Sequence, residues 1–185
     1  MKVVGFTQIR NELSKGNLHN WLKQMFEFCE YVYIYDQNSV DGSKEVYKNY
    51  PNLIVVESKT NDFKNEIFCK DILLKKLIEE QPDTDFIFWL DGDSLIDNNL
   101  VKDDNLILNS ILEYAIKNNI DGILMEHYNL WRSDIHYRVD SNYHDLSHGV
   151  CAIWRNNGIL EYNKINGLHQ QQFPNGMIKM MKIPF

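Results

Sequence analysis

The chain has 185 residues, of which 44% are hydrophobic and 12% aromatic. This is enough apolar material to bury a core and too much for a disordered chain. The formal net charge is −7 and the lysines and arginines form no cluster, so phosphate-tracking nucleic-acid binding is disfavoured and no nucleic-acid partner is expected.

Three widely separated cysteines, Cys29, Cys69 and Cys151, form no CxxC pair. This usage is typical of reduced, buried cysteines in a cytoplasmic protein. The first predicted strand begins near Lys2, which leaves no room for a signal peptide. No apolar run approaches the roughly 20 residues of a membrane span. We therefore expect a cytoplasmic protein without a transmembrane segment, for which a peripheral contact with a membrane surface stays open.

Short apolar runs alternate with segments of helical periodicity along the chain. The predicted strands cover residues 3–6, 31–35, 53–56, 86–90 and 120–125. The first predicted helix starts at the N-cap Asn17 and buries one apolar face between residues 18 and 29. A short helix follows residue 43, and another helix lies near residues 106–117.

A longer helix is predicted over roughly residues 65–80, and Pro82 ends it. The residues expected to face inward are Ile67, Phe68, Ile72, Leu73, Leu77 and Ile78. Apolar strands joined by helices are typical of a mostly parallel sheet with helices on both faces. The sequence therefore predicts a Rossmann-like α/β fold in a single domain over residues 1–185.

Ligands of such folds bind beyond the carboxyl ends of the strands, where the strand order reverses. The polar stretches that follow the predicted strands are residues 8–12, 36–43, 58–64, 91–97 and 126–131. These five stretches are therefore where we expect the functional side chains.

Asp91-Gly92-Asp93 directly follows a predicted apolar strand. Two carboxylates one residue apart can face the same side, and the glycine permits a close approach of backbone or ligand. Hard carboxylate oxygens suit Mg²⁺ or Mn²⁺, which share their other positions with water and substrate phosphates. The alternative is that Asp-Gly-Asp is simply a turn sequence. A helix-loop-helix calcium site is excluded, because Leu95 and Ile96 stand where an oxygen ligand and a glycine are needed.

Four motifs occur in order in the first hundred residues. They are Thr7-Gln8-Ile9-Arg10-Asn11-Glu12, Trp21-Leu22, Ile34-Tyr35-Asp36-Gln37-Asn38-Ser39-Val40-Asp41-Gly42-Ser43 and Trp89-Leu90-Asp91-Gly92-Asp93. Together they resemble the family-2 type of glycosyltransferase with the GT-A fold. The resemblance implies a metal-assisted, inverting transfer of a sugar from a nucleotide-diphosphate donor to a glycan, lipid-linked or protein acceptor.

The resemblance also implies roles for parts of the chain. Residues 1–100 would form the nucleotide-sugar-binding half, and residues 101–185 the acceptor-side half. Related chains usually run past the equivalent of Phe185, so this chain is either compact or truncated at its C-terminus. The residues expected to contact the nucleotide or donor are Arg10, Glu12, Asp36, Asn38 and Asp91. Asp91 and Asp93 match the family's Asp-x-Asp motif and are expected to hold Mn²⁺ or Mg²⁺.

The sequence contains neither GxGxxG nor GxxxxGK[ST], so a bound diphosphate needs another source of positive charge. A metal at Asp91 and Asp93 would supply it and neutralise the leaving nucleotide diphosphate. Lys64 and Lys70 are further candidates, but we interpret both as solvated helix charges.

An inverting transfer needs a general base that deprotonates the acceptor hydroxyl. The candidates are Glu126, Asp134, Asp140, Asp145, Glu161 and His169. Relatives often carry a His–Glu or Glu–Asp pair after a strand that residues 152–155 resemble, and here Leu168-His169-Gln170 stands instead. We expect His169 to act as a third metal ligand or as the base, with Asp140 or Glu161 as the base otherwise.

Two other functions are compatible with the residues. A phosphatase of the haloacid-dehalogenase type would use Asp91 and Asp93 as nucleophile and acid, but its Asp-x-Asp belongs early in the chain. Here three strand–helix units precede the motif. A catalytically silent nucleotide-sugar-binding module that retains the fold is the other alternative.

Overall fold

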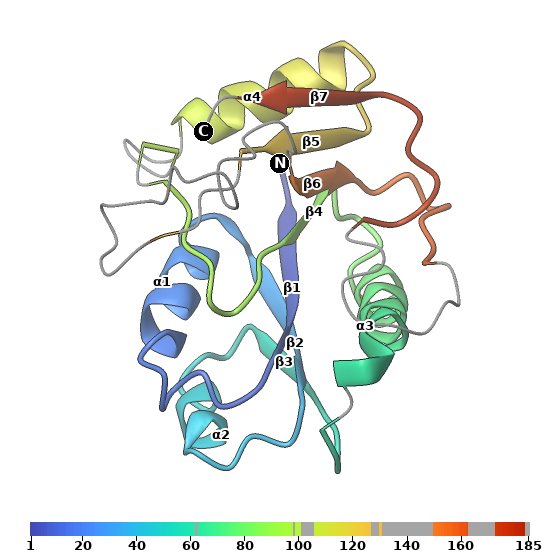
Figure 1. Ribbon diagram of the computed structural model, residues 1–185. Coiled ribbons are helices and arrows are strands. Elements are labelled where there is room, and N and C mark those ends of the chain that lie inside the picture. The colour runs from blue at the N-terminus through green and yellow to red at the C-terminus, as the bar shows by residue number, and fades with distance from the viewer. Residues whose placement is uncertain are drawn as a thin grey trace, which may run out of the picture.

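The computed structural model describes residues 1–61, 63–97, 99–100, 106–126, 130, 150–162 and 173–183. Its centre is a seven-stranded sheet with the order β3-β2-β1-β4-β6-β5-β7 (Figure 1). The strands are β1 (Val3–Ile9), β2 (Tyr31–Asp36), β3 (Leu53–Glu57), β4 (Phe86–Trp89), β5 (Gly122–Met125), β6 (Val150–Arg155) and β7 (Met180–Ile183). The helices are α1 (Leu18–Phe28), α2 (Ser43–Tyr47), α3 (Glu66–Glu80) and α4 (Leu106–Lys117), with the 3-10 helix η1 (Phe63–Asn65) before α3.

The sheet is mostly parallel, as the sequence predicted. β1 pairs in parallel with β2 and β4, β2 with β3, and β5 with β7. Of the seven strands only β6 is reversed, and it lies between β4 and β5. All five predicted strands are present. β7 was not predicted, because its residues show neither alternation nor a continuous apolar run.

Helices cover both faces of the sheet, which confirms the predicted α/β architecture (Figure 1). On one face, α1, α2 and α4 enclose a core that includes Trp21 of α1. On the other face, α3 packs through Leu73 against a core that includes Phe6 and Trp154. Gly5 allows α1 to lie directly on β1, because an added Cβ would stand 2.3 Å from Cε of Met25.

One local prediction is wrong, and a second is confirmed in its position but not in its hydrogen bond. Phe68 faces solvent with 56% of its surface exposed, because the inward stripe of α3 runs through Leu73 and Leu77. Asn17 stands at the N-cap of α1, but its side chain makes no capping hydrogen bond. The Asn17 amide donates to Glu12 Oε2 at 2.8 Å instead. The sequence pattern therefore predicted where α1 starts. It did not predict the partner of the Asn17 side chain, because that partner, Glu12, is placed by the loop before the helix.

No helix in the described part of the chain combines the length and the apolar composition needed to cross a membrane.

Candidate active site

The candidate site lies where the strand order reverses. From β1 the chain adds β2 and β3 on one side, and then places β4 on the other side of β1. The carboxyl ends of β1 and β4 therefore border the crevice in which ligands of such sheets bind. Ile9 ends β1 beside Asp36 at the end of β2, and Asp91 follows two residues after the end of β4.

The segment after β4 is held by α1. The Trp21 indole N–H donates to the carbonyl oxygen of Leu90 at 3.2 Å. Farther along the segment, the Gln24 side chain donates to and accepts from the Ile96 backbone, both at 3.2 Å. The helix that covers the sheet therefore also fixes both ends of the loop that carries the two aspartates.

Gly92 allows this loop to approach the end of β1. A Cβ at Gly92 would stand 3.1 Å from both Cγ of Glu12 and Cγ1 of Ile9. The turn itself is closed by the Ser94 N–H, which donates to the Asp91 carbonyl at 2.9 Å. A larger residue would push the turn away from β1, so glycine sets where the aspartates lie.

Asp91 is an exposed residue, and Trp89 holds one oxygen of its carboxylate. The Trp89 indole N–H donates to Asp91 Oδ1 at 3.0 Å. Surrounding protein removes part of the solvation of the carboxylate, and this desolvation raises the pKa of Asp91. The positive charge of Lys70 and the Trp89 hydrogen bond lower the pKa, and the Asp93 charge raises it further.

Lys70 is buried, so its interpretation as a solvated helix charge is wrong. Only 2% of its surface is exposed, and its Nζ lies 2.6 Å from Oε1 of Glu66. The same Nζ stands 4.3 Å from the centroid of the Trp89 ring. Sequence reasoning missed Glu66 and Trp89 as parts of the site. The available signal was an i,i+4 acid–base pair within the inward stripe of a helix.

The two exposed carboxylates fit an open metal site better than a closed one. Among the described residues, no group of three His, Cys, Asp or Glu side chains could enclose a metal ion. Asp91 and Asp93 are both exposed at the strand end. Mg²⁺ is commonly held by one or two carboxylates while water and substrate phosphates complete its shell. The predicted third ligand, His169, lies outside the described residues.

Glu12 and Arg10, both in the loop after β1, differ in their burial and in their contacts. Glu12 is 6% exposed, and its two oxygens accept from Lys15 Nζ at 2.6 Å and from the Asn17 amide at 2.8 Å. Glu12 therefore ties its own loop together. Arg10 is half-buried, and within the described part of the chain no carboxylate forms an ion pair with it. Its role at the nucleotide stays a prediction.

Asp36 has no exposed surface. Its Oδ1 accepts from the Ser39 backbone N–H at 2.7 Å, and its Oδ2 accepts from the Tyr47 hydroxyl at 2.9 Å. Burial and the Asp36 charge raise the pKa of Tyr47, so this hydroxyl stays a donor. Asn38 adopts a positive φ of 58° within the same turn. A direct contact of Asp36 or Asn38 with a nucleotide stays a prediction.

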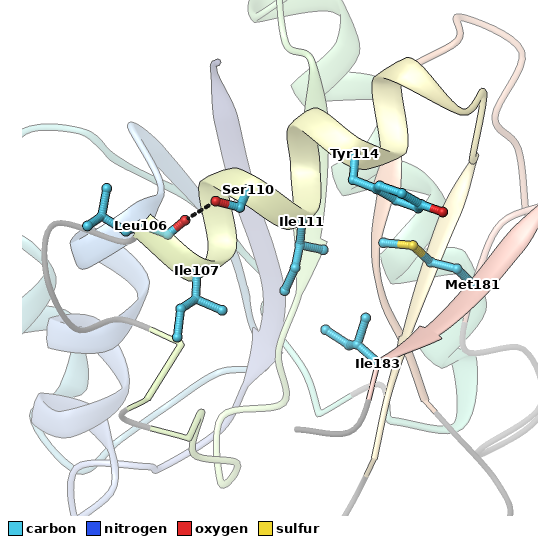
Figure 2. Close-up of a pocket in the computed structure, with 7 residues that line it drawn as sticks. All are labelled: Leu106, Ile107, Ser110, Ile111, Tyr114, Met181 and Ile183. Carbon is cyan, nitrogen blue, oxygen red and sulfur yellow. Dashed lines mark hydrogen bonds between the residues drawn. The ribbon is translucent and has the colours of Figure 1, made fainter.

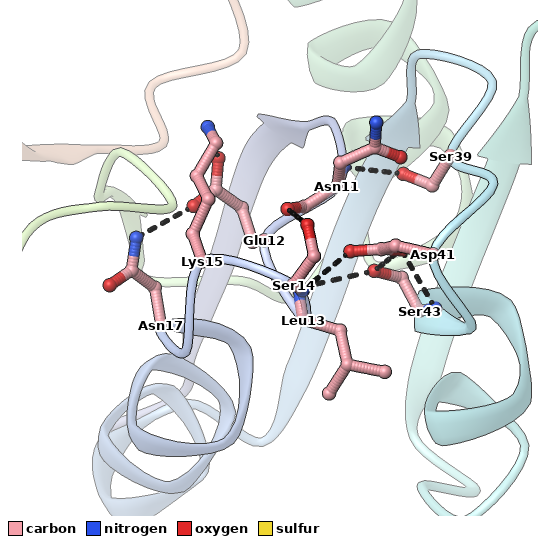
Figure 3. A network of polar contacts seen from close by, with 9 residues as sticks. All are labelled: Asn11, Glu12, Leu13, Ser14, Lys15, Asn17, Ser39, Asp41 and Ser43. Atoms are coloured by element: carbon pink, nitrogen blue, oxygen red, sulfur yellow. Dashed lines mark hydrogen bonds and ion pairs between the residues drawn. The ribbon is translucent and has the colours of Figure 1, made fainter.

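The loops after β1 and β2 are interlocked by hydrogen bonds, most of which Figure 3 shows. The Asn11 N–H donates to Ser39 Oγ at 2.9 Å, and Asn11 Oδ1 accepts from the Val40 N–H at 2.9 Å. The Ser14 N–H donates to Asp41 Oδ2 at 2.8 Å. The polar residues of both predicted stretches therefore build one rigid rim beside the aspartates.

The general-base candidates are only partly described. Asp134, Asp140, Asp145 and His169 lie outside the described residues. Glu126 forms an ion pair with Lys182 at 3.1 Å. Glu161 forms an isolated bridge with Asn175 through backbone hydrogen bonding, and its residue is exposed. No described carboxylate is therefore identified as the base.

An apolar pocket of about 480 Å³ lies elsewhere, between α4 and β7 (Figure 2). Its lining comprises Leu106, Ile107, Ser110, Ile111, Tyr114, Met181 and Ile183. This lining contains no carboxylate or basic group. It is therefore unsuited to holding a metal or a diphosphate, and the chemistry is assigned to the crevice beside Asp91.

Comparison with known proteins agrees with this geometry. The model of the galactosyl transferase GMA12/MNN10 family matches residues 23–169, a span that includes Asp36, Lys70, Asp91 and Asp93. No curated protein matches the chain. The match and the family-2-type resemblance agree on a nucleotide-sugar transferase of the GT-A type. The chain belongs to the galactosyl transferase GMA12/MNN10 family of glycosyltransferases.

Proposed function

We propose that the protein transfers a hexosyl group from a nucleoside-diphosphate sugar to a hydroxyl of a glycan acceptor. The family description favours galactose as the transferred sugar. The observation that carries the proposal is the Asp91-Gly92-Asp93 turn at the carboxyl ends of β1 and β4, where the strand order reverses. Lipid-linked and protein acceptors are alternatives that product analysis would separate.

In this proposal Asp91 and Asp93 hold Mn²⁺ or Mg²⁺ through their exposed carboxylates. When bound, the ion neutralises the charge that develops on the leaving nucleoside diphosphate. Trp89 orients one oxygen of Asp91, and the approach of Gly92 to Glu12 keeps both aspartates beside the loop after β1. Arg10, the first residue after β1, would bring positive charge to the nucleotide in an otherwise acidic protein.

The expected inverting course requires a general base, for which His169 and Asp140 are the sequence candidates. If His169 is a metal ligand, His169→Ala should raise the Mn²⁺ concentration for half-maximal activity, and excess metal should partly restore turnover. If it is the base, turnover should fall by roughly 10²–10⁴ at constant metal affinity. The anomeric configuration of the product, read by NMR, decides whether transfer inverts.

The proposal is tested by donor turnover with purified protein and a panel of nucleoside-diphosphate sugars, with Mn²⁺ or with EDTA. We expect metal-dependent release of nucleoside diphosphate that Asp91→Asn and Asp93→Asn both abolish. A phosphatase would instead release inorganic phosphate from sugar phosphates, and a silent module would bind donor without turnover. Either result would contradict the proposal.

The cytoplasmic location expected from the cysteines is a separate proposal. Cys29 and Cys69 are buried thiols that form no disulfide with each other, which is compatible with a reducing compartment. Imaging of the tagged protein in its native cells would test it.

A further inference from the structure

A connected row of buried groups lies behind the Asp91 carboxylate. Glu66 Oε1 holds Lys70 Nζ at 2.6 Å, and this Nζ stands 4.3 Å from the Trp89 ring centroid. The Trp89 indole N–H then donates to Asp91 Oδ1 at 3.0 Å. The row joins α3 to the strand that leads into the aspartate turn, so it links the core on one face of the sheet to the candidate metal site.

We propose that Trp89 and Lys70 are positioning residues that set the metal affinity of Asp91. This inference rests on the proposed function, because it needs Asp91 to be a metal ligand. Trp89 fixes Oδ1 by its N–H, and no described residue donates a hydrogen bond to the other oxygen. Partners that orient a ligating carboxylate typically change metal affinity by about 10–100-fold when they are removed.

Burial argues that Lys70 acts through Trp89 and does not itself touch the donor. Lys70 is 2% exposed, and its ammonium is already held by the Glu66 carboxylate. A cation over an indole face is attracted by the ring quadrupole, and it draws electron density from the ring, which makes the indole N–H a stronger donor. The Lys70 charge also acts on Asp91 directly and lowers the pKa of its carboxyl group, an effect that the Glu66 charge opposes.

The chain offers a matched control for Trp89. Trp154 is fully buried, and its ring contacts Phe6 edge-on at 5.8 Å between centroids, compared with 4.8 Å for Trp89. The Trp154 indole N–H has no hydrogen-bond partner within the described residues. Trp154→Phe therefore removes a core indole that orients nothing, whereas Trp89→Phe removes the one that holds Asp91.

The experiment measures the binding of Mn²⁺ alone to the donor-free protein, from the free Mn²⁺ signal in electron paramagnetic resonance. Trp89→Phe should weaken Mn²⁺ binding about tenfold, and Trp154→Phe should leave it within about twofold of the wild type. Melting temperatures are recorded for both variants, and both should fall, because each removes buried aromatic surface. Equal Mn²⁺ affinities in the two variants would overturn the proposal.

A second set of variants tests Lys70 without relying on Trp89→Phe. The double variant Glu66→Gln/Lys70→Met removes both buried charges together, so neither is left unpaired, and it should weaken Mn²⁺ binding several-fold. Lys70→Arg keeps a cation over the Trp89 ring and should retain most of the wild-type affinity for Mn²⁺. A double variant with wild-type affinity would refute the role of Lys70.

The outcomes also separate this inference from the proposed function. If the wild type binds Mn²⁺ and Asp91→Asn does not, the metal site stands, and Trp89→Phe then decides the inference alone. If Asp91→Asn binds Mn²⁺ as the wild type does, both the metal assignment and the inference fail.

Discussion

At the residue scale, opposing influences act on the Asp91 carboxylate. Desolvation raises its pKa, whereas the charge of Lys70 and the N–H of Trp89 lower it, and the net result is a raised pKa. The charged form is therefore less favourable in the folded, metal-free protein than in the unfolded chain. The ionised Asp91 carboxylate therefore lowers the stability of the metal-free fold. A bound cation would remove this loss of stability, as expected for a carboxylate that serves as a metal ligand.

The first prediction concerns Asp91→Asn in metal-free protein. A raised folded-state pKa means that the ionised carboxylate destabilises the fold at neutral pH, where it is charged in both states. The variant should therefore melt at a higher temperature than the wild type at pH 7. The difference should shrink as the pH falls through the folded-state pKa toward the ordinary value of 3.8. Calorimetry in EDTA measures this, and a lower melting temperature at pH 7 would contradict the assigned cause.

At the scale of elements, the turn between β2 and α2 depends on one buried carboxylate. Asp36 joins the end of β2 to the Ser39 N–H in the turn and to the Tyr47 hydroxyl in α2. The loop after β1 is joined to this turn, because the Asn11 N–H donates a hydrogen bond to Ser39 Oγ. Asp36 therefore supports the rim of the crevice, whether or not it also contacts a nucleotide.

The second prediction separates these two roles of Asp36. Asp36→Ala should lower the free energy of unfolding by roughly 1–3 kcal/mol, because it leaves buried donors unpaired. Tyr47→Phe breaks one of the same hydrogen bonds and keeps the carboxylate. Chemical denaturation gives the stability of both variants, and calorimetric titration gives their affinity for nucleoside diphosphate in the presence of Mn²⁺. Weaker binding in Asp36→Ala alone would assign a ligand contact, whereas parallel losses would make Asp36 a structural residue.

At the scale of the whole molecule, the charge of −7 opposes the binding of a nucleoside diphosphate. The chain has no glycine-rich phosphate loop, and Lys70, the cation near the aspartates, is buried and paired. Binding of the donor by the folded protein should therefore depend on a metal ion. A ligand that binds only the folded state raises its stability in proportion to the logarithm of ligand concentration.

The third prediction follows from this dependence. Nucleoside diphosphate with Mn²⁺, at about 100 times its dissociation constant, should stabilise the protein by about 2.7 kcal/mol. The same nucleotide in EDTA should give little shift, and Asp93→Asn should show none with Mn²⁺. Thermal-shift assays check this, with Mn²⁺ alone as the control. An equal shift in EDTA would show that the nucleotide binds without the aspartates.

The sequence by itself determined five of the seven strands, the four α-helices and the position of the aspartate turn. Buried parallel strands are continuously apolar, and helices repeat their apolar face every three or four residues, so both are visible locally. The placement of Asp91-Gly92-Asp93 after such a strand then predicted the candidate site, because all parallel strands present their carboxyl ends at one edge.

Only the tertiary structure decided what surrounds that turn. Lys70 looked like a solvated helix charge because most lysines are solvated, and only the packing of α3 showed that Lys70 and its partner Glu66 are both buried. The strand-end position of Asp36 is visible in the sequence, and its contact with a nucleotide stays a prediction, whereas its hydrogen bond to Tyr47 depends on how α2 folds back. The insertion of the reversed strand β6 between β4 and β5 likewise depends on long-range pairing. Local pattern fixes which residues form an element, but burial and partners arise only when elements from distant parts of the chain pack together.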